Sequence, residues 1–177
     1  MPQQTEVWKE FESNEISHSV AHHLTAIGEL TAEHGYARVS DVARHLDITR
    51  GSASLTLKAL RQKNYVLEDE NKFLRLSPEG QRIVNQILAK RRIVRTFLHD
   101  VLKLDPHRAE VDACKVEHLL SVETGTALLR FLRFLLSNTD KSKTFLEEYW
   151  GKDDTTEDLE SFEIGADEGL IGRSQPD

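Results

Sequence analysis

The sequence contains a single cysteine, Cys114, among its 177 residues. One cysteine cannot form an internal disulfide, so nothing points to an oxidising compartment. The sequence also lacks any apolar run near the roughly 20 residues that span a bilayer. Its first residues, MPQQTEVWKEFES, lack the character of a signal peptide. These absences predict a cytoplasmic protein without a membrane segment.

The chain also lacks the positive net charge that is common among nucleic-acid-binding proteins, since its formal net charge is −7. This charge is unevenly distributed. Residues 138–177 hold 12 acidic and 4 basic residues, whereas residues 1–137 hold 18 acidic and 19 basic residues. The tail therefore carries −8 and the rest of the chain +1, which leaves DNA open as a partner.

The first part of the chain, residues 1–76, has the pattern of a small DNA-binding domain. We expect a helix that ends before Gly35, with Asn14 as its N-cap and an apolar stripe at helical spacing. The stripe consists of Ile16, Val20, Leu24, Ile27 and Leu30. A short extra helix is expected within residues 4–12.

The stretch ARVSDVARHLDITRGSASLTLKALRQKNYV contains two short helical patterns separated by the breaker DITRG. We expect Ser40 to start the first helix and Ser52 the second. The side chains available for packing in the second are Leu55, Leu57, Ala59 and Leu60. The alternating segments YVLE and KFLRL flank a polar turn at 69–71 and predict a β-hairpin. Helix, helix-turn-helix and hairpin in this order form a winged helix-turn-helix domain.

The second helix of a helix-turn-helix enters the major groove through its first turn. The side chains that we expect to contact double-stranded operator DNA are Thr49, Arg50, Ser52, Ser54, Lys58 and, at the wing tip, Lys72. Arg50 suits guanine edges or a phosphate, and the hydroxyls suit phosphate oxygens. From residue 35 to 75 there are eight basic and five acidic residues, so this region is locally basic. The alternative is a merely amphipathic helix with a serine cap; the correctly placed wing favours DNA binding.

Beyond the hairpin, residues 77–137 predict an all-helical domain. One long helix is expected from Pro78 to Val101, a second around Cys114, and a third over VETGTALLRFLRFLL. Their apolar surface exceeds what one small domain can bury, so we expect a homodimer formed through these helices. Residues 138–177 are expected to form a helix at KSKTFLEEYW and then a poorly ordered acidic stretch. The predicted fold class is mainly α.

Three possible metal ligands occur close together in VDACKVEHLL: Cys114, Glu117 and His118. On an α-helix, positions i, i+3 and i+4 share one face, so these side chains can point to one spot. They form half of a metal site in one interpretation. In the other, Cys114 is a buried free cysteine beside two solvated polar residues.

With its winged helix and the spacing C-x-x-E-H, the chain resembles the family of the diphtheria toxin repressor and the manganese transport regulator. The stretches GYARVSDVARHL and ACKVEH carry the resemblance, which covers residues 14–137. It implies a non-enzymatic, metal-dependent repressor of metal-uptake genes that binds operator DNA as a dimer. It also implies one ligand from the first helix, which falls on His22 and completes the set with Cys114, Glu117 and His118.

Two departures from the family pattern stand out. Where the family's ancillary site has a His and a Glu on the long helix, this chain has Arg91 and Arg95, and a further ancillary His falls on Glu110. Arginine stays protonated and does not ligate metals, so an ion pair with Glu110 is expected to replace the second ion. A second-metal carboxylate of manganese-type members falls on Thr25.

A thiolate, two imidazoles and one carboxylate form a softer ligand set than the oxygen-rich sites that suit manganese. Such a set suits iron(II), cobalt or zinc. We expect iron(II), because the cysteine form of the motif resembles the iron-responsive branch. Manganese is the alternative, because the chain length resembles the short manganese branch.

Two other functional classes stay open. A metal-free winged-helix regulator would sense oxidants through Cys114, which requires an accessible environment that favours the thiolate. A small metallohydrolase would use the same four residues, although four protein ligands leave little open coordination for a substrate.

Overall fold

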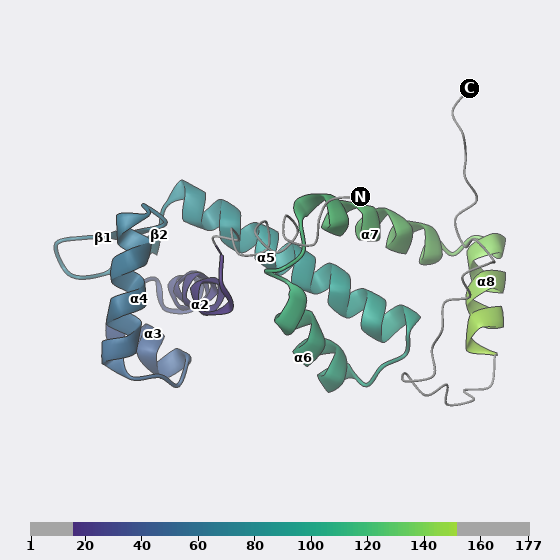
Figure 1. Cartoon of the computed structure of the whole chain (residues 1–177), viewed down its shortest axis with the longest axis horizontal. Helices are drawn as coiled ribbons and strands as arrows, with labels where there is room; N and C mark the ends of the chain where they lie inside the picture. Colours follow the sequence, from purple (N-terminus) through teal and green to yellow (C-terminus); the bar gives the residue numbers. More distant parts are fainter. Residues whose placement is uncertain (1–15, 152–177) are drawn as a thin grey trace, which may run out of the picture. The chain divides into compact units, whose positions relative to one another are not determined.

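The computed structural model describes residues 16–151, which are mainly helical with one small β-hairpin (Figure 1). Its elements in chain order are α2 (His18–His34), α3 (Val39–His45), α4 (Arg50–Gln62), β1 (Val66–Glu68), β2 (Leu74–Leu76), α5 (Pro78–Thr96), the π-helical turn η1 (Phe97–Val101), α6 (Pro106–Val116), α7 (Val122–Leu135) and α8 (Asp140–Trp150). The predicted fold class is confirmed. The expected helix within residues 4–12 and the acidic stretch after residue 151 lie outside the described residues.

The chain divides into two compact units, residues 1–137 and 138–177. The first contains everything from α2 to α7, and the second contains α8. Helix α5, which begins at the predicted domain boundary, contacts α2 and β2 as well as α6 and α7. The boundary predicted between residues 76 and 77 stays a prediction. Among residues 16–151, no helix has the length and apolar character needed to cross a membrane.

Helix α2 begins later than the sequence indicated. Ser17, not Asn14, is its N-cap, and the Ser17 hydroxyl accepts a hydrogen bond from the backbone N–H of Val20 at 3.3 Å. The helix ends at Gly35, whose φ of 80° is the left-handed conformation that glycine adopts without strain. The predicted apolar stripe faces the core: Leu24, Ile27 and Leu30 are buried, and Ile16 and Val20 pack at its edge.

Helices α3 and α4 form the helix-turn-helix, and both begin before the predicted serines. Helix α3 begins at Val39, and α4 begins at Arg50 because Thr49 is its N-cap and accepts a hydrogen bond from the N–H of Ser52 at 3.2 Å. The inward face of α4 differs in part from the predicted set. The buried residues are Ala53, Leu57 and Leu60, at helical spacing. Two side chains expected to pack, Leu55 and Ala59, lie on the exposed face.

The wing is a short antiparallel hairpin in which Val66 pairs with Leu76 and Glu68 with Leu74. At its turn, a carboxylate oxygen of Asp69 accepts hydrogen bonds from the N–H groups of Asn71 and Phe73, both at 2.9 Å. Val66, Leu74 and Leu76 pack into the same core as α2, α3 and α4, whereas Leu67 is exposed. The winged helix-turn-helix therefore has one continuous core, with α2 lying between the α3–α4 pair and α5 (Figure 1).

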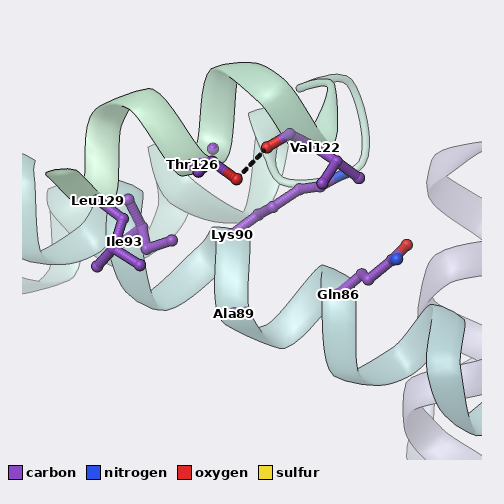
Figure 2. Close-up of a pocket in the computed structure, with 8 residues that line it drawn as sticks. Gln86, Ala89, Lys90, Ile93, Val122, Thr126 and Leu129 are labelled. Carbon is purple, nitrogen blue, oxygen red and sulfur yellow. Dashed lines mark hydrogen bonds between the residues drawn. The ribbon is translucent and has the colours of Figure 1, made fainter.

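The long helix α5 continues from the wing into the second half of the unit. It packs against α6 and α7, and the ammonium group of Lys90 donates a hydrogen bond to the carbonyl oxygen of Leu120 at 2.6 Å. Figure 2 shows the Lys90 side chain running from α5 toward the start of α7, beside a shallow apolar hollow that includes Ile93 and Leu129. Helix α5 therefore connects the DNA-binding part to the segment that contains Cys114.

The first turn of α5 is packed tightly against the end of α4. A Cβ added at Gly80 would lie 2.1 Å from the carbonyl oxygen of Tyr65, and that oxygen already accepts a hydrogen bond from the N–H of Ser77 at 3.0 Å. The backbone cannot give way without breaking this turn, so only glycine fits at this position.

We predict that Gly80→Ala lowers the free energy of unfolding by about 2 kcal/mol or more, because it overpacks a rigid backbone contact. Gly51→Ala is the matched control, since its Cβ would meet only Thr49 Oγ1 at 3.9 Å. Alanine favours the helix at that exposed position, so Gly51→Ala should leave stability equal or slightly higher. Urea unfolding of the two variants tests this prediction. Equal unfolding midpoints would contradict the close approach of Gly80 to the Tyr65 backbone.

Candidate metal centre and DNA-binding surface

Helix α2 presents two imidazoles on one face, close to its N-terminus. His18 and His22 are one turn apart, and their ring centroids are 4.3 Å apart. His18 is exposed and His22 is half-buried. This histidine pair is positioned by the same helix that packs its opposite face against the core of the helix-turn-helix.

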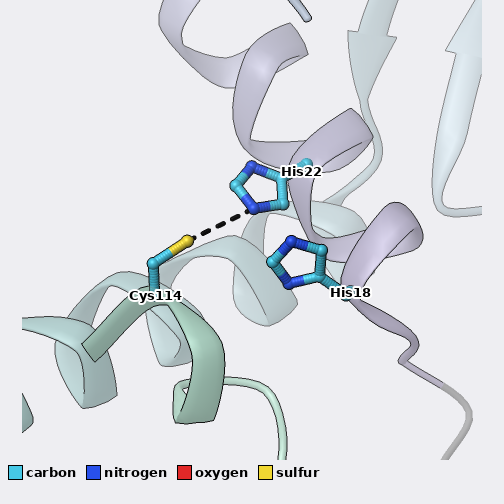
Figure 3. A group of neighbouring side chains, drawn as sticks. All are labelled: His18, His22 and Cys114. Carbon is cyan, nitrogen blue, oxygen red and sulfur yellow. Dashed lines mark hydrogen bonds between the residues drawn. The ribbon is translucent and has the colours of Figure 1, made fainter. Parts of the chain in front are cut away.

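The last turn of α6 brings Cys114 to this pair. The Cys114 Sγ atom lies 3.4 Å from His22 Nε2, although the two residues are 92 positions apart in the chain. One ligand atom each from His18, His22 and Cys114 lie within 4.8 Å of one another (Figure 3). The structure thus brings together two of the predicted ligands, His22 and Cys114, and adds His18.

The other two predicted ligands lie just beyond α6. Helix α6 ends at Val116, and Glu117 is its C-cap. Because the dihedral angles of Glu117 are still helical, Cys114 and Glu117 keep the i, i+3 spacing of one helix face. His118 follows, and its ring centroid is 5.1 Å from that of His18. The Glu117 side chain is 3% exposed and its Oε2 atom is 3.7 Å from Arg91 Nε. Glu117 therefore lies on the α5 side of the cluster.

Arg91 belongs to a cluster of charged side chains between α5 and α6. Its Nε atom donates to Glu110 Oε1 at 2.7 Å, and Arg95 Nε lies 3.0 Å from Glu110 Oε2. The Glu110 carboxylate is thus held between two guanidinium groups, while Arg91 also faces Glu117. Two arginines and two glutamates balance their formal charges here. Thr25, by contrast, is buried on α2, and its hydroxyl donates to the carbonyl of Ala21 at 3.0 Å.

Burial and neighbouring charges set the protonation states at the candidate centre. Burial, followed by the charges of His18 and Arg91, lowers the pKa of His22, and burial and His18 lower the pKa of His118. Burial and the Glu117 carboxylate raise the pKa of Cys114. Burial raises the pKa of Glu117 to about 7, against the opposing effect of Arg91. The imidazoles are therefore ready to offer lone pairs, and a bound cation would have to displace the thiol proton.

Two features indicate that this cluster suits a cation: a buried carboxylate oxygen without a hydrogen bond, and a set of nitrogen and sulfur donor atoms. The Glu117 Oε2 atom is buried and makes no hydrogen bond, which is costly for a carboxylate. A thiol and several imidazoles beside it form a donor set for a transition metal. The raised pKa of Cys114 also works against oxidant sensing, because the thiolate is the reactive form.

The sequence analysis did not count His18 among the ligands. The signal was the stretch HSVAHH, in which His18 and His22 share the i, i+4 spacing of one helix face. The third histidine, His23, is on a different face: it is buried, and its Nδ1 atom is 2.7 Å from the carbonyl oxygen of Ser19.

The predicted DNA-contacting residues lie on an exposed surface of α4 and the wing. Thr49 caps α4, and the exposed residues that follow are Arg50, Ser52, Ser54 and Lys58. Lys72, at the wing turn, is 79% exposed and its ammonium group is 3.0 Å from a Glu68 carboxylate oxygen. These side chains are therefore exposed, whereas the face of α4 with Ala53, Leu57 and Leu60 packs into the core.

Comparisons with known proteins agree with this arrangement. Residues 77–160 match the model of the iron dependent repressor, metal binding and dimerisation domain. The HTH-type transcriptional regulator MntR of Listeria innocua is 27% identical over 139 residues, which cover 78% of this chain and 97% of that relative. The diphtheria toxin repressor of Corynebacterium glutamicum is 26% identical over 110 residues, or 62% of this chain and 48% of that relative.

Solved structures show the same fold. IdeR of T. acidophilum superposes with a TM-score of 0.55 at 26% identity over 63% of this chain and 53% of that one, and the manganese regulator SloR with 0.58 at 23% identity over 64% and 53%. The chain spans about half the length of these solved chains. In sequence and fold the chain is similar to the diphtheria toxin repressor and to the transcriptional regulator MntR.

The relatives named above are transcriptional regulators. One apolar hollow of this chain lies between α5 and α7. Among its lining residues only Lys90 is titratable, and its ammonium group already donates to the Leu120 carbonyl. No acid–base pair lines this hollow.

The buried Glu117 carboxylate predicts a pH dependence of stability in metal-free protein. Because its pKa is raised from 4.5 in the unfolded chain to about 7 in the folded one, its contribution falls as pH rises from 4.5 to 7. A rise of this size corresponds to a loss of roughly 3 kcal/mol. Urea unfolding in chelator should show this loss in the wild type and in Glu123→Gln, an exposed control, but not in Glu117→Gln. Parallel curves for all three would contradict it.

Proposed function

We propose that the chain is a metal-dependent transcriptional repressor that binds operator DNA as a homodimer when a divalent transition metal occupies the centre between α2 and α6. The observation that carries this proposal is the 3.4 Å approach of Cys114 Sγ to His22 Nε2. It joins the helix that supports the helix-turn-helix to the segment beyond α5. The exposed first turn of α4 supports DNA as the partner.

The proposed ligands are His22, Cys114, Glu117 and His118. When bound, the metal supplies a fixed positive charge and bonds that hold α2 and α6 together. His22 provides the only one of these ligands from the DNA-binding half. Glu117 provides a buried carboxylate oxygen that makes no hydrogen bond with any described residue.

We propose iron(II) as the metal in the cell. The thiol and imidazoles favour borderline metals over manganese, which prefers oxygen ligands. The matching family model is named for an iron dependent repressor. Manganese is the second candidate, because two solved structures of the same fold are named as the manganese regulator SloR and a manganese-dependent transcriptional repressor. The pairing of the Glu110 carboxylate with Arg91 and Arg95, in place of a second ion, supports one ion per subunit.

The coupling between metal and DNA follows from the contacts of α2. This helix packs against α3, α4, β2 and α5, so fixing its N-terminal face to α6 also restrains the recognition helix α4. The metal then favours the DNA-competent arrangement by its differential affinity for that arrangement.

A second subunit is proposed to cover the apolar surface of the helical part. Phe131 and Phe134 on α7 are 46% and 52% exposed, and a further apolar hollow of about 330 Å³ lies between α5 and α7 near Leu136. Exposed aromatic side chains beside an apolar hollow are typical of a subunit interface. The family model matched here includes a dimerisation domain.

We predict that His22→Ala abolishes, and Cys114→Ser reduces, the difference in DNA affinity between protein in chelator and protein with iron(II) or manganese. Fluorescence anisotropy with a DNA duplex selected by the metal-loaded wild type measures this difference. Cys114→Ser should lose more of the iron response than of the manganese response, because the harder ion depends less on sulfur. His34→Ala, an exposed histidine at the far end of α2, is the control and should respond like the wild type. If the wild type binds the duplex equally with and without metal, the proposed function is wrong.

Arg50 and Lys72 are expected to affect DNA binding in different ways. Arg50→Ala should weaken binding to the selected duplex by about 1–3 kcal/mol if Arg50 pairs with a guanine, and should relax the preference at that base. Lys72→Ala should weaken binding to all duplexes alike and reduce its salt dependence. Competition binding over a series of salt concentrations distinguishes the two effects. Unchanged affinity for both variants would place a different surface against DNA.

A further inference from the structure

We propose that His18 is an additional ligand of the metal, so that α2 contributes a pair of imidazoles and the site discriminates against manganese. This inference deepens the proposed function and rests on it. It concerns the arrangement of His18, His22 and Cys114, which meet within 4.8 Å through one ligand atom each.

The first argument is geometric. Ligand atoms in a tetrahedral site with bonds of about 2.0–2.3 Å lie roughly 3.3–3.8 Å apart. The Cys114 Sγ to His22 Nε2 distance of 3.4 Å already falls in that range. The His18 ring is close to both other imidazoles, at centroid distances of 4.3 Å from His22 and 5.1 Å from His118. One ligand atom of His18 lies within 4.8 Å of those of His22 and Cys114, and the His18 side chain is exposed.

The second argument concerns the opposite side of the cluster. There α5 presents Arg91, whose Nε atom is 3.7 Å from Glu117 Oε2 and which is hydrogen-bonded to Glu110. A guanidinium group offers no lone pair and repels a cation. Among residues 16–151, α2 is the element that faces Cys114 from the other side, and beside His22 it places His18 there (Figure 3).

The kinds of atom that would bind the ion determine which metal the site prefers. Adding His18 yields three imidazoles and a thiolate beside one carboxylate. Nitrogen and sulfur donors suit iron(II), cobalt and zinc, whereas manganese is favoured by carboxylate, carbonyl and water. His18 is thus expected to set the preference among metals more than the ability to bind one.

The test is titration of cobalt(II) into the metal-free full chain, followed by competition with zinc and manganese. His18→Ala should weaken cobalt and zinc binding by about tenfold or more, because losing a ligand costs at least as much as losing its outer-shell partner. It should also alter the cobalt d–d bands while keeping the sulfur-to-cobalt charge-transfer band of Cys114. The manganese affinity should change less than the zinc affinity. The matched control, His34→Ala, should keep the wild-type spectrum and affinities.

A second variant separates ligation from a structural role. His18→Glu supplies an oxygen ligand at the same position and should shift the preference toward manganese relative to His18→Ala. His18 is exposed and opens its helix, so both variants should retain the wild-type circular dichroism. A His18→Ala protein with wild-type cobalt bands and unchanged zinc affinity would overturn the role of His18 alone. A wild type that binds no cobalt would overturn the proposed function as well.

Discussion

The approach of the Cys114 thiol to the His22 imidazole is the contact on which the rest of the site depends. It connects α2 to α6 across 92 positions of the chain. The two helices are not consecutive, since α3, α4, the hairpin, α5 and η1 lie between them in the sequence. Helix α2 has two faces with different roles: its apolar stripe supports α3 and α4, and its histidine face meets the end of α6. Any ion held by this pair therefore acts on the helix that positions the recognition helix.

Fixed charges on α5 shape the other side of the centre. Arg91 and Arg95 hold the Glu110 carboxylate between them, and Arg91 also faces the buried Glu117. These cations are permanent, since a guanidinium does not lose its proton in proteins. They balance the local carboxylates without a second ion. Because they occupy the side of the cluster that faces α5, the side that faces α2 is left for a bound ion. The charge cluster and the histidine pair thus support the same proposal of one ion bound between α2 and α6.

Much of this arrangement could be predicted from the sequence, because periodicity and turn residues are local signals. The helices, the wing and the end of α2 at Gly35 follow from such signals. The starts of α2 and α4 were misplaced because several residues near each start can serve as caps, and packing selects Ser17 and Thr49. Leu55 is exposed because α4 packs through the face that contains Ala53, Leu57 and Leu60.

The candidate site was predictable only in part. The spacing of Cys114, Glu117 and His118 is visible in the sequence, and the resemblance supplied His22. The place of His18 depends on how α2 packs against the α6 segment, which is a long-range contact that no local pattern encodes. The same holds for Arg91, whose position between Glu110 and Glu117 arises from the packing of α5 on α6.

The central claim is that metal at the α2–α6 centre and DNA at α4 favour one and the same arrangement of the chain. Thermodynamic linkage requires that DNA tighten metal binding by the same factor by which metal tightens DNA binding. The most direct test is the dissociation constant of cobalt(II), measured with and without a saturating DNA duplex selected by the metal-loaded protein. The account predicts tighter cobalt binding on DNA, by a factor equal to the gain in DNA affinity. A cobalt affinity that DNA leaves unchanged would contradict it.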